Sequence, residues 1–215
     1  VEGGSIGDIY GRAFERDEQG RIVYETEGDY AGLPRTVGDG NTVKVGNANP
    51  RFSLSWSNTV SYKGVSLALL DCRYGGRLLS QTMADMDSYG VTKATADARD
   101  RGYVTLEGRR IEDVRGFYKL VGGRAGVTEY YMYDATNIRL RELSLSYALP
   151  KQLVRRTRVF SAVSVSLVAR NLFFIYNASP FDPDLVLSTG NDNQGIDVYG
   201  MPTVRSVGFN IKLEF

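Results

Sequence analysis

Acidic and amide side chains gather between positions 182 and 197, where they could bind a cation. The group consists of Asp182, Asp184, Asn191, Asp192, Asn193 and Asp197. A calcium loop would need regularly spaced Asp residues, a Gly and a distal Glu, and this spacing does not supply them. Asp and Asn are also common in turns, because their side chains hydrogen-bond to the neighbouring backbone. We therefore expect a turn-rich loop here, with no metal and no cofactor.

Tyrosine and aspartate side chains in the expected loops could recognise a ligand. A tyrosine ring can stack on a sugar, and hydroxyl and carboxylate groups can hydrogen-bond to a sugar or a peptide. The same residues could instead pack a loop or contact a partner protein, so both roles stay open. The candidates for ligand or partner contact are Tyr103, Tyr118, Tyr130, Tyr131, Asp182 and Tyr199.

Composition argues against catalysis and against nucleic-acid binding. The chain has no histidine, which removes the commonest general base and metal ligand. Its one cysteine, Cys72, excludes an internal disulfide, and we expect it to be a packing residue on a strand. The net charge is +1 and the basic residues are spread along the chain, so no basic stripe for nucleic acid is present. We therefore do not expect an enzyme.

The segments that would position these residues are β-strands in which apolar and polar residues alternate. In the last ten residues, 206–215, apolar side chains occupy every second position and polar residues or Gly occupy the rest. Successive side chains of a strand point to opposite faces, so one face of this strand is apolar and the other is polar. Similar alternation predicts strands at 52–62, 138–149 and 163–176, and a less regular one at 65–74. We expect the apolar face to contact lipid through Trp56, Leu67, Leu145, Leu167 and Phe209.

Two arginines interrupt the pattern of the strand at 138–149. Arg139 and Arg141 have the same parity as Leu143 and Leu145, which lie on the expected apolar face. A β-bulge between Leu140 and Leu143 would shift the register and move both arginines to the polar face. The alternative is that the arginines lie beyond the apolar band.

The connections between these strands alternate in length. They are short at Lys63-Gly64 and at 150–160, where Arg155, Arg156 and Arg158 form a solvated face, and long at 75–134 and 177–203. Antiparallel pairing then places both long loops on one side, as in bacterial outer-membrane barrels, whose short turns are periplasmic. Helix-forming residues predict helices at 78–89 and 92–101 within the first long loop. Residues 1–50 form a loop region with one hairpin, in which 8–14 and 21–25 flank the turn 17–20.

Five strands cannot close a transmembrane barrel, because about eight are needed. We therefore expect an all-β chain, 1–215, that is the C-terminal fragment of a larger antiparallel barrel. Its parts are the loop region 1–50, the strand pair 52–74, the long extracellular loop 75–134, and the last three strands with their loop, 138–215. The alternative is a soluble all-β carbohydrate-binding module that buries the apolar face.

Several short motifs follow one another in order along essentially the whole chain. They include Gly46-Asn47-Ala48-Asn49-Pro50, Ser61-Tyr62-Lys63-Gly64, Gly90-Val91-Thr92-Lys93-Ala94-Thr95, Asp134-Ala135-Thr136-Asn137-Ile138-Arg139, Leu140-Arg141-Glu142-Leu143-Ser144-Leu145-Ser146-Tyr147, Arg170-Asn171-Leu172-Phe173, Phe181-Asp182-Pro183-Asp184 and Gln194-Gly195-Ile196-Asp197. Together they resemble the C-terminal part of the SusC/RagA family of TonB-linked outer-membrane transporters of Bacteroidetes-type bacteria. The motifs at 140–147 and 170–173 are shared more broadly by TonB-dependent receptors, whereas those at 90–95 and 181–184 are typical of the SusC-like branch.

The resemblance implies a 22-stranded barrel with an N-terminal plug, in a Gram-negative outer membrane. It implies energy from TonB through a part that this chain lacks, a SusD-like surface lipoprotein over the extracellular face, and import of oligosaccharides or peptides. The C-terminus would then be periplasmic. The residues of the expected C-terminal insertion signal are Phe209, Ile211, Leu213 and Phe215.

Overall fold

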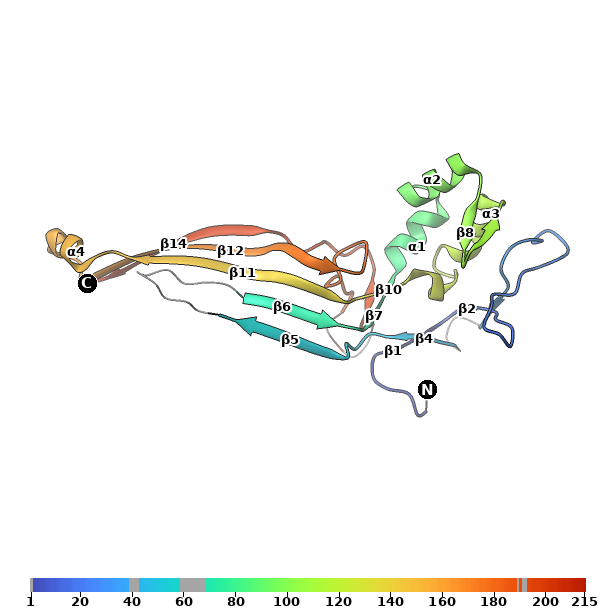
Figure 1. The fold of residues 1–215 in the computed structure, drawn as a ribbon, viewed down its shortest axis with the longest axis horizontal. Coiled ribbons are helices and arrows are strands. Elements are labelled where there is room, and N and C mark those ends of the chain that lie inside the picture. Colours follow the sequence, from blue (N-terminus) through green and yellow to red (C-terminus); the bar gives the residue numbers. More distant parts are fainter. Residues whose placement is uncertain (1, 39–42, 59–68, 189, 191–192) are drawn as a thin grey trace. The chain divides into compact units, whose positions relative to one another are not determined.

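The chain forms two compact units, which we call the loop unit and the sheet unit (Figure 1). The computed structural model describes residues 2–38, 43–58, 69–188, 190 and 193–215. The loop unit comprises residues 1–49, 76–134 and 185–201. The sheet unit comprises residues 50–75, 135–184 and 202–215. Each unit is therefore built from three separate stretches of the sequence.

The sheet unit is a single antiparallel sheet of five strands in the order β14-β12-β11-β6-β5. Its elements are β5 (Phe52–Ser57), β6 (Leu69–Tyr74), β11 (Asn137–Ala148), α4 (Lys151–Thr157), β12 (Ala162–Asn177) and β14 (Ser206–Glu214). The prediction of five antiparallel strands is confirmed. The predicted turn at Lys63-Gly64 and the predicted lipid contact of Leu67 lie outside the described residues.

The register of the sheet aligns side chains of one kind across neighbouring strands. Leu145 of β11 lies opposite Leu167 of β12, and Leu167 lies opposite Phe209 of β14. One residue along each strand, Ser146, Ser166 and Asn210 form the equivalent row on the other face. The row of apolar side chains is exposed to solvent, because Leu145, Leu167 and Phe209 have exposed fractions of 48%, 50% and 76%. Trp56 of β5 is likewise 58% exposed.

Of the two alternatives for the arginines of β11, the structure has the bulge. Leu140 pairs with Leu70 of β6, but the next pair joins Glu142 to Leu69, which leaves Arg141 as the extra residue. The pairing of β11 with β12 shifts at the same place, because Leu140 lies opposite Phe173 and Glu142 lies opposite Arg170. Leu140 and Glu142 therefore lie on opposite faces despite their common parity.

The chain terminus and the short connection meet at one end of the sheet. The connection between β11 and β12, residues 149–161, contains α4, and Ser161 follows it. The backbone amide of Ser161 donates to the carbonyl of Glu214 at 2.7 Å, and its hydroxyl donates to the carbonyl of Phe215 at 3.2 Å. The rings of Phe160 and Phe215 are 5.2 Å apart. The longer connections 75–136 and 178–205 both leave the opposite end, where Asn137 pairs with Asn177.

The loop unit has short strands, three helices and an apolar core. Its strands are β1 (Asp8–Gly11), β2 (Ala13–Phe14), β3 (Thr36–Val37), β4 (Val43–Asn47), β7 (Arg77–Ser80), β8 (Val104–Leu106), β9 (Arg109–Ile111), β10 (Met132–Asp134) and β13 (Ile196–Asp197). Its helices are α1 (Gln81–Ser88), α2 (Lys93–Arg101) and α3 (Val114–Val121), with the 3-10 turn η1 (Thr128–Tyr131). The buried cluster contains Phe14, Ile22, Leu33, Ala84, Ala98, Val104, Leu106, Ile111, Phe117, Tyr118, Val121, Val127 and Tyr131.

Polar caps decide where these helices begin. The predicted helix at 78–89 starts only at Gln81, because the Ser80 hydroxyl accepts the amide of Met83 at 3.2 Å and the preceding residues form β7. The predicted helix at 92–101 is present, with Thr92 as its N-cap. Helix α3 was not predicted. Its N-cap Asp113 accepts the amide of Gly116, and a Cβ at Gly116 would collide with that carboxylate.

The N-terminal hairpin prediction is partly wrong. The turn at 17–20 is present, since the amide of Asp17 donates to the carbonyl of Arg21 at 2.9 Å. However, β1 pairs with β4 and β2 pairs with β3, so most of 8–14 pairs with later residues. Of the helices that the described residues form, none is both long and apolar enough to cross a membrane.

Candidate functional site

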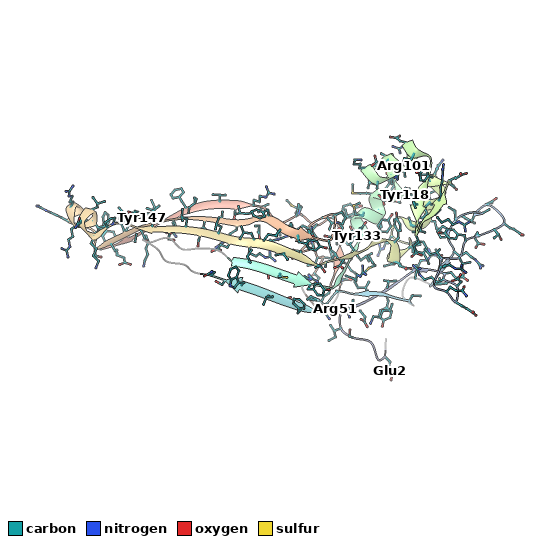
Figure 2. All side chains as sticks on the ribbon, viewed as in Figure 1. Glu2, Arg51, Arg101, Tyr118, Tyr133 and Tyr147 are labelled. Atoms are coloured by element: carbon teal, nitrogen blue, oxygen red, sulfur yellow. The ribbon has the colours of Figure 1, made fainter. Side chains whose placement is uncertain are left out.

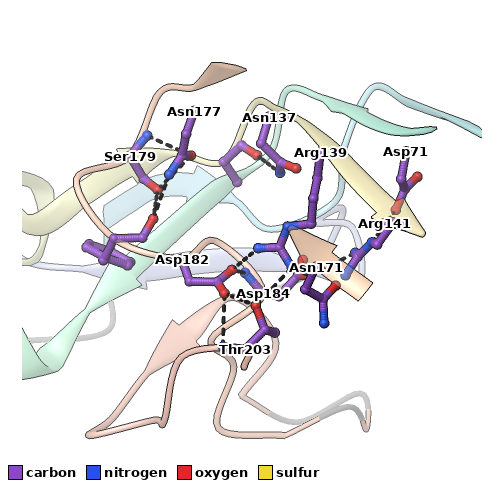
Figure 3. Close-up of polar contacts among 12 residues, drawn as sticks. Asp71, Asn137, Arg139, Arg141, Asn171, Asn177, Ser179, Asp182, Asp184 and Thr203 are labelled. Carbon is purple, nitrogen blue, oxygen red and sulfur yellow. Dashed lines mark hydrogen bonds and ion pairs between the residues drawn. The ribbon is translucent and has the colours of Figure 1, made fainter. Parts of the chain in front are cut away.

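The polar face of the sheet unit carries a buried ionic network around Arg139 (Figure 3). The guanidinium donates from Nη1 to Asp184 Oδ2 at 3.0 Å and to Thr203 Oγ1 at 3.1 Å, and from Nη2 to Asp182. It also lies over the Phe174 ring, 3.9 Å from the ring centre. Arg139 is only 1% exposed, so its charge depends on these partners rather than on water.

Arg141 extends the network to two further strands. Its Nη2 lies 2.8 Å from Asp184 Oδ2, and its Nε donates to Asp71 Oδ2 of β6 at 3.0 Å. Asp71 in turn accepts the hydroxyl of Ser55 in β5 at 3.1 Å. The bulge makes this possible, because it places Arg139 and Arg141 on the polar face together. Two guanidinium groups and three carboxylates thus join β5, β6 and β11.

The same network holds the connection that follows β12. Asp182 accepts the hydroxyl and the amide of Thr203, the latter at 3.1 Å, and the amide of Asp184 at 3.1 Å. Burial acts to raise the pKa of the Asp182 carboxyl, but these hydrogen bonds and Arg139 outweigh it and hold the pKa below its usual value. An ionised carboxylate therefore fixes residues 182–184 and Thr203 to the sheet.

Asparagine side chains complete this end of the sheet. Asn177 donates from Nδ2 to the carbonyl of Phe181 at 2.9 Å, and Ser179 donates its hydroxyl to the same carbonyl at 2.6 Å. Asn171 has φ of 51° at the bulge of β12 and donates to the carbonyl of Val204 at 3.3 Å. Asparagine adopts such a left-handed conformation more readily than most residues. These hydrogen bonds hold the connection that follows β12 against the sheet.

The loop unit contains a second candidate site, a pocket of about 500 Å³ among α1, α2 and α3. Its floor includes Asp87, which is 4% exposed. The Asp87 carboxylate accepts the Thr92 hydroxyl at 2.6 Å and the Tyr131 hydroxyl at 3.0 Å. Burial raises the pKa of the Asp87 carboxyl, and these two hydrogen bonds oppose the rise. Three exposed basic residues, Arg99, Arg115 and Lys119, are part of the lining.

The structure divides the six predicted contact residues between packing and exposed positions. Tyr131 is 1% exposed and Tyr118 is 7% exposed, so both are mainly core residues, although Tyr118 also lines the pocket. Tyr130 packs edge-on against Phe117, with ring centres 5.3 Å apart. Burial raises the pKa of the Tyr130 and Tyr131 hydroxyls, as expected for packed rings. Figure 2 shows Tyr118 and Arg101 in the helical part of the loop unit.

The other three predicted residues have different surroundings. Asp182 is bound to Arg139 within the ionic network. Tyr103 lies under Arg110, 4.0 Å from guanidinium carbon to ring centre. Tyr199 is 61% exposed, and its hydroxyl donates to Asp85 at 3.2 Å. Contact with a substrate or a partner stays a prediction for all six residues.

The four residues of the predicted insertion signal lie along one exposed face of the C-terminal segment. Their exposed fractions are 76% for Phe209, 54% for Ile211, 44% for Leu213 and 84% for Phe215. The role in insertion stays a prediction. Sequence reasoning missed the Arg139 network and the basic pocket. The bulge hinted at the first, and the spacing of Val114, Phe117, Tyr118 and Val121 could have revealed α3 and with it the second.

Comparison with known proteins supports the sequence interpretation. No protein-family model matches the chain. It is 24% identical to TonB-dependent receptor P3 of Formosa agariphila, in a match covering 100% of this chain and 22% of that receptor. A chain of the RagAB peptide importer in the open-open state matches 97% of this chain with a TM-score of 0.61 and 17% identity. The predicted SusC/RagA-type fold is confirmed.

This chain spans less than a quarter of each of these relatives. It spans 22% of the matched RagAB chain in the open-open state. It spans 23% of the matched chain in the closed-closed state, where the TM-score is 0.54 at 16% identity. The names of these relatives are those of a receptor and a peptide importer, not of enzymes.

Proposed function

We propose that this chain forms part of the barrel wall of a TonB-dependent transporter in a Gram-negative outer membrane. The observation that carries the proposal is the sheet with one polar face and one apolar face, the apolar face being exposed. Leu145, Leu167 and Phe209 form an exposed apolar row, and Ser146 and Ser166 are hydrogen-bonded to each other at 2.8 Å on the opposite face. Lipid would cover the first face, and the barrel lumen would hydrate the second.

Strand lengths support this assignment. β11 has 12 residues, β12 has 16 and β14 has 9. A tilted strand needs about 9–11 residues to cross the hydrocarbon core of a bilayer. A soluble carbohydrate-binding module would instead require a second layer over the apolar row. The exposed fractions of that row argue against such a module.

The finer parts of the proposal concern cargo, partner and orientation. The cargo is a peptide or an oligosaccharide, and the likeness to the RagAB peptide importer supports the peptide class. A SusD-like lipoprotein covers the extracellular side, and TonB acts through the rest of the receptor. The long connections 75–136 and 178–205 are extracellular, so Phe215 and α4 lie on the periplasmic side.

An arginine placed on each face of β12 tests the proposal in the full-length receptor. Leu167→Arg places a charge in lipid and should cost about 2–4 kcal/mol of folding free energy near the bilayer centre. Ser166→Arg is the matched control, because the neighbouring side chain points to the polar face. The readouts are urea unfolding of the receptor in vesicles and the amount of folded, heat-modifiable protein in outer membranes.

The proposal requires the Leu167 variant to lose more stability than the Ser166 variant. Equal loss in both variants would show that the two faces have the same surroundings. Greater loss in Ser166→Arg would mean that the presumed lumen face is a packed interface. Either result contradicts the proposed barrel wall.

A further inference from the structure

The pocket in the loop unit has the composition of a binding site for an anionic ligand. It is formed by the end of α1, by α2 and by α3, and its volume of about 500 Å³ lies within the usual range for small-molecule sites. The lining residues that carry the inference are Tyr89, Arg99, Arg115, Tyr118 and Lys119.

The basic side chains of the pocket have no acidic partner among the residues that the structure describes. Arg99, Arg115 and Lys119 are exposed, and none of them belongs to any of the ion pairs found there. Arg99 makes only a long hydrogen bond, 3.5 Å, to the carbonyl of Gly90. Three cations without counter-charges therefore lie around one cavity.

Of the two acidic residues in the pocket lining, Asp87 is already engaged. Asp87 accepts hydrogen bonds on both carboxylate oxygens, from Thr92 and from Tyr131, and is buried. Glu112 lies 3.9 Å from the Nε of Arg110, which is outside the pocket lining. The charge available to a ligand is thus mainly positive.

An exposed aromatic ring provides the apolar part of the site. Tyr89, the C-cap of α1, is 83% exposed, which is unusual for a side chain of this size. Tyr118 contributes to the wall and is held by the core, where its ring lies 5.4 Å from that of Phe117. A rigid wall, an exposed ring and three cations together suit a ligand that carries both a ring or apolar group and an anionic oxygen group.

We propose that this pocket binds the anionic oxygen group, a carboxylate in the simplest case, of a short oligomeric ligand. Arg99, Arg115 and Lys119 bind the anion, and Tyr89 packs against the adjoining sugar ring or apolar side chain. An acidic oligosaccharide and an acidic peptide both supply this chemistry. These ligand classes are those of the proposed cargo, so the inference deepens the proposed function and rests on it for the choice of ligand, whereas the binding itself requires no transport.

The test is equilibrium binding to the full-length receptor in detergent, measured by calorimetry. The probes are trigalacturonate and the peptide Phe-Glu-Glu, each compared with a neutral counterpart, maltotriose and amidated Phe-Gln-Gln. The triple variant Arg99→Gln, Arg115→Gln, Lys119→Gln should lower the affinity for the acidic probe that binds at least tenfold. Tyr89→Ala should lower the same affinity about fivefold. Arg124→Gln, an exposed arginine of the same unit outside the pocket lining, is the matched control and should leave affinity unchanged.

The outcomes separate the two ligand sources and the two proposals. Binding of trigalacturonate alone identifies an acidic sugar, and binding of Phe-Glu-Glu alone identifies a peptide. If neither acidic probe binds, if the neutral probes bind equally well, or if the triple variant binds like wild type, the pocket proposal is overturned. None of these results depends on whether the receptor imports its cargo or on how Leu167→Arg behaves.

Discussion

The loop unit and the sheet unit solve the problem of apolar surface in opposite ways. The loop unit buries its apolar residues in a cluster of its own, in which Phe117 and Val121 are fully buried. The sheet unit leaves Leu167 and Phe209 exposed and instead buries a charged residue, Arg139. A soluble domain shows the first arrangement, whereas a sheet placed between lipid and water can have the second. The two units are therefore stabilised by different interactions, and substitutions in one unit can test its interactions separately from those of the other.

The largest effect on the sheet unit should come from removing the buried guanidinium. Arg139→Met leaves Asp182 without its cation in a buried position, which should cost about 3–5 kcal/mol. The measurement is urea unfolding of the full-length receptor in vesicles. Arg170→Met is the control, because the pair of Arg170 with Glu142 is exposed, with 63% of the Arg170 side chain accessible, and should contribute about 1 kcal/mol or less.

A second substitution shows whether the charge causes this loss. Adding Asp182→Asn to Arg139→Met removes the unpaired carboxylate and should recover part of the stability. No recovery would indicate that the packing of Arg139 against Phe174 matters more than the ion pair. A loss no larger than that of Arg170→Met would contradict the view that this network fixes the sheet.

In the loop unit, a substitution that creates a cavity in the core should lower the free energy of unfolding by a comparable amount, but only for that unit. Phe117→Ala removes a fully buried ring and should destabilise the loop unit by about 3–5 kcal/mol. We expect trypsin to cut within 76–134 sooner than in wild type, while the amount of folded, heat-modifiable barrel changes little. Val91→Ala, at a side chain 66% exposed, is the control. An equal loss of folded barrel would show that the two units do not fold independently.

The smallest effect concerns the pH dependence of the loop unit. Burial raises the pKa of the Asp87 carboxyl above its ordinary value of 3.8, so the folded unit takes up a proton more readily than the unfolded chain. The stability contributed by Asp87 is therefore greatest below pH 3.8, falls as the pH rises through the raised pKa, and is constant above it.

Hydrogen exchange of the α1 and α3 amides, corrected for the intrinsic pH dependence of exchange, measures this change. In wild type the opening free energy should decrease with rising pH across that window. The Asp87→Asn variant should lose this component. An opening free energy that increases with pH would mean that the hydrogen bonds from Thr92 and Tyr131 outweigh burial.

The sequence predicted the sheet unit well because its strands follow a period of two. The five strands were recognisable from that period, and the bulge was one of two alternatives suggested by the positions of Arg139 and Arg141, which violate it. The ionic partners could not be found in this way, since Asp71 and Asp184 lie far from Arg141 along the chain and no periodicity relates them. Their proximity results from pairing of strands that are distant in sequence.

The loop unit was harder to predict because capping and long-range pairing override local patterns there. Ser80 moved the start of the expected helix to Gln81, since its hydroxyl caps α1. Helix α3 was not predicted because it contains Gly116, and glycine usually interrupts helices. Here the missing side chain of Gly116 leaves room for the carboxylate of the Asp113 cap. The pairing of β1 with β4 spans more than thirty residues and left no local turn signal.

The bulge at Arg141 divides β11 into two reading frames. A strand assigns side chains to its faces in steps of two, so residues 137–140 follow one frame and residues 142–148 follow the other. Inserting or deleting one residue inside either frame would exchange the side chains of the apolar face and those of the polar face from that point onward. Length changes in this strand should therefore come in even numbers. Deletion of Arg141 itself would merge the two frames into one and leave Arg139 on the polar face, because Leu140 and Glu142 already lie on opposite faces.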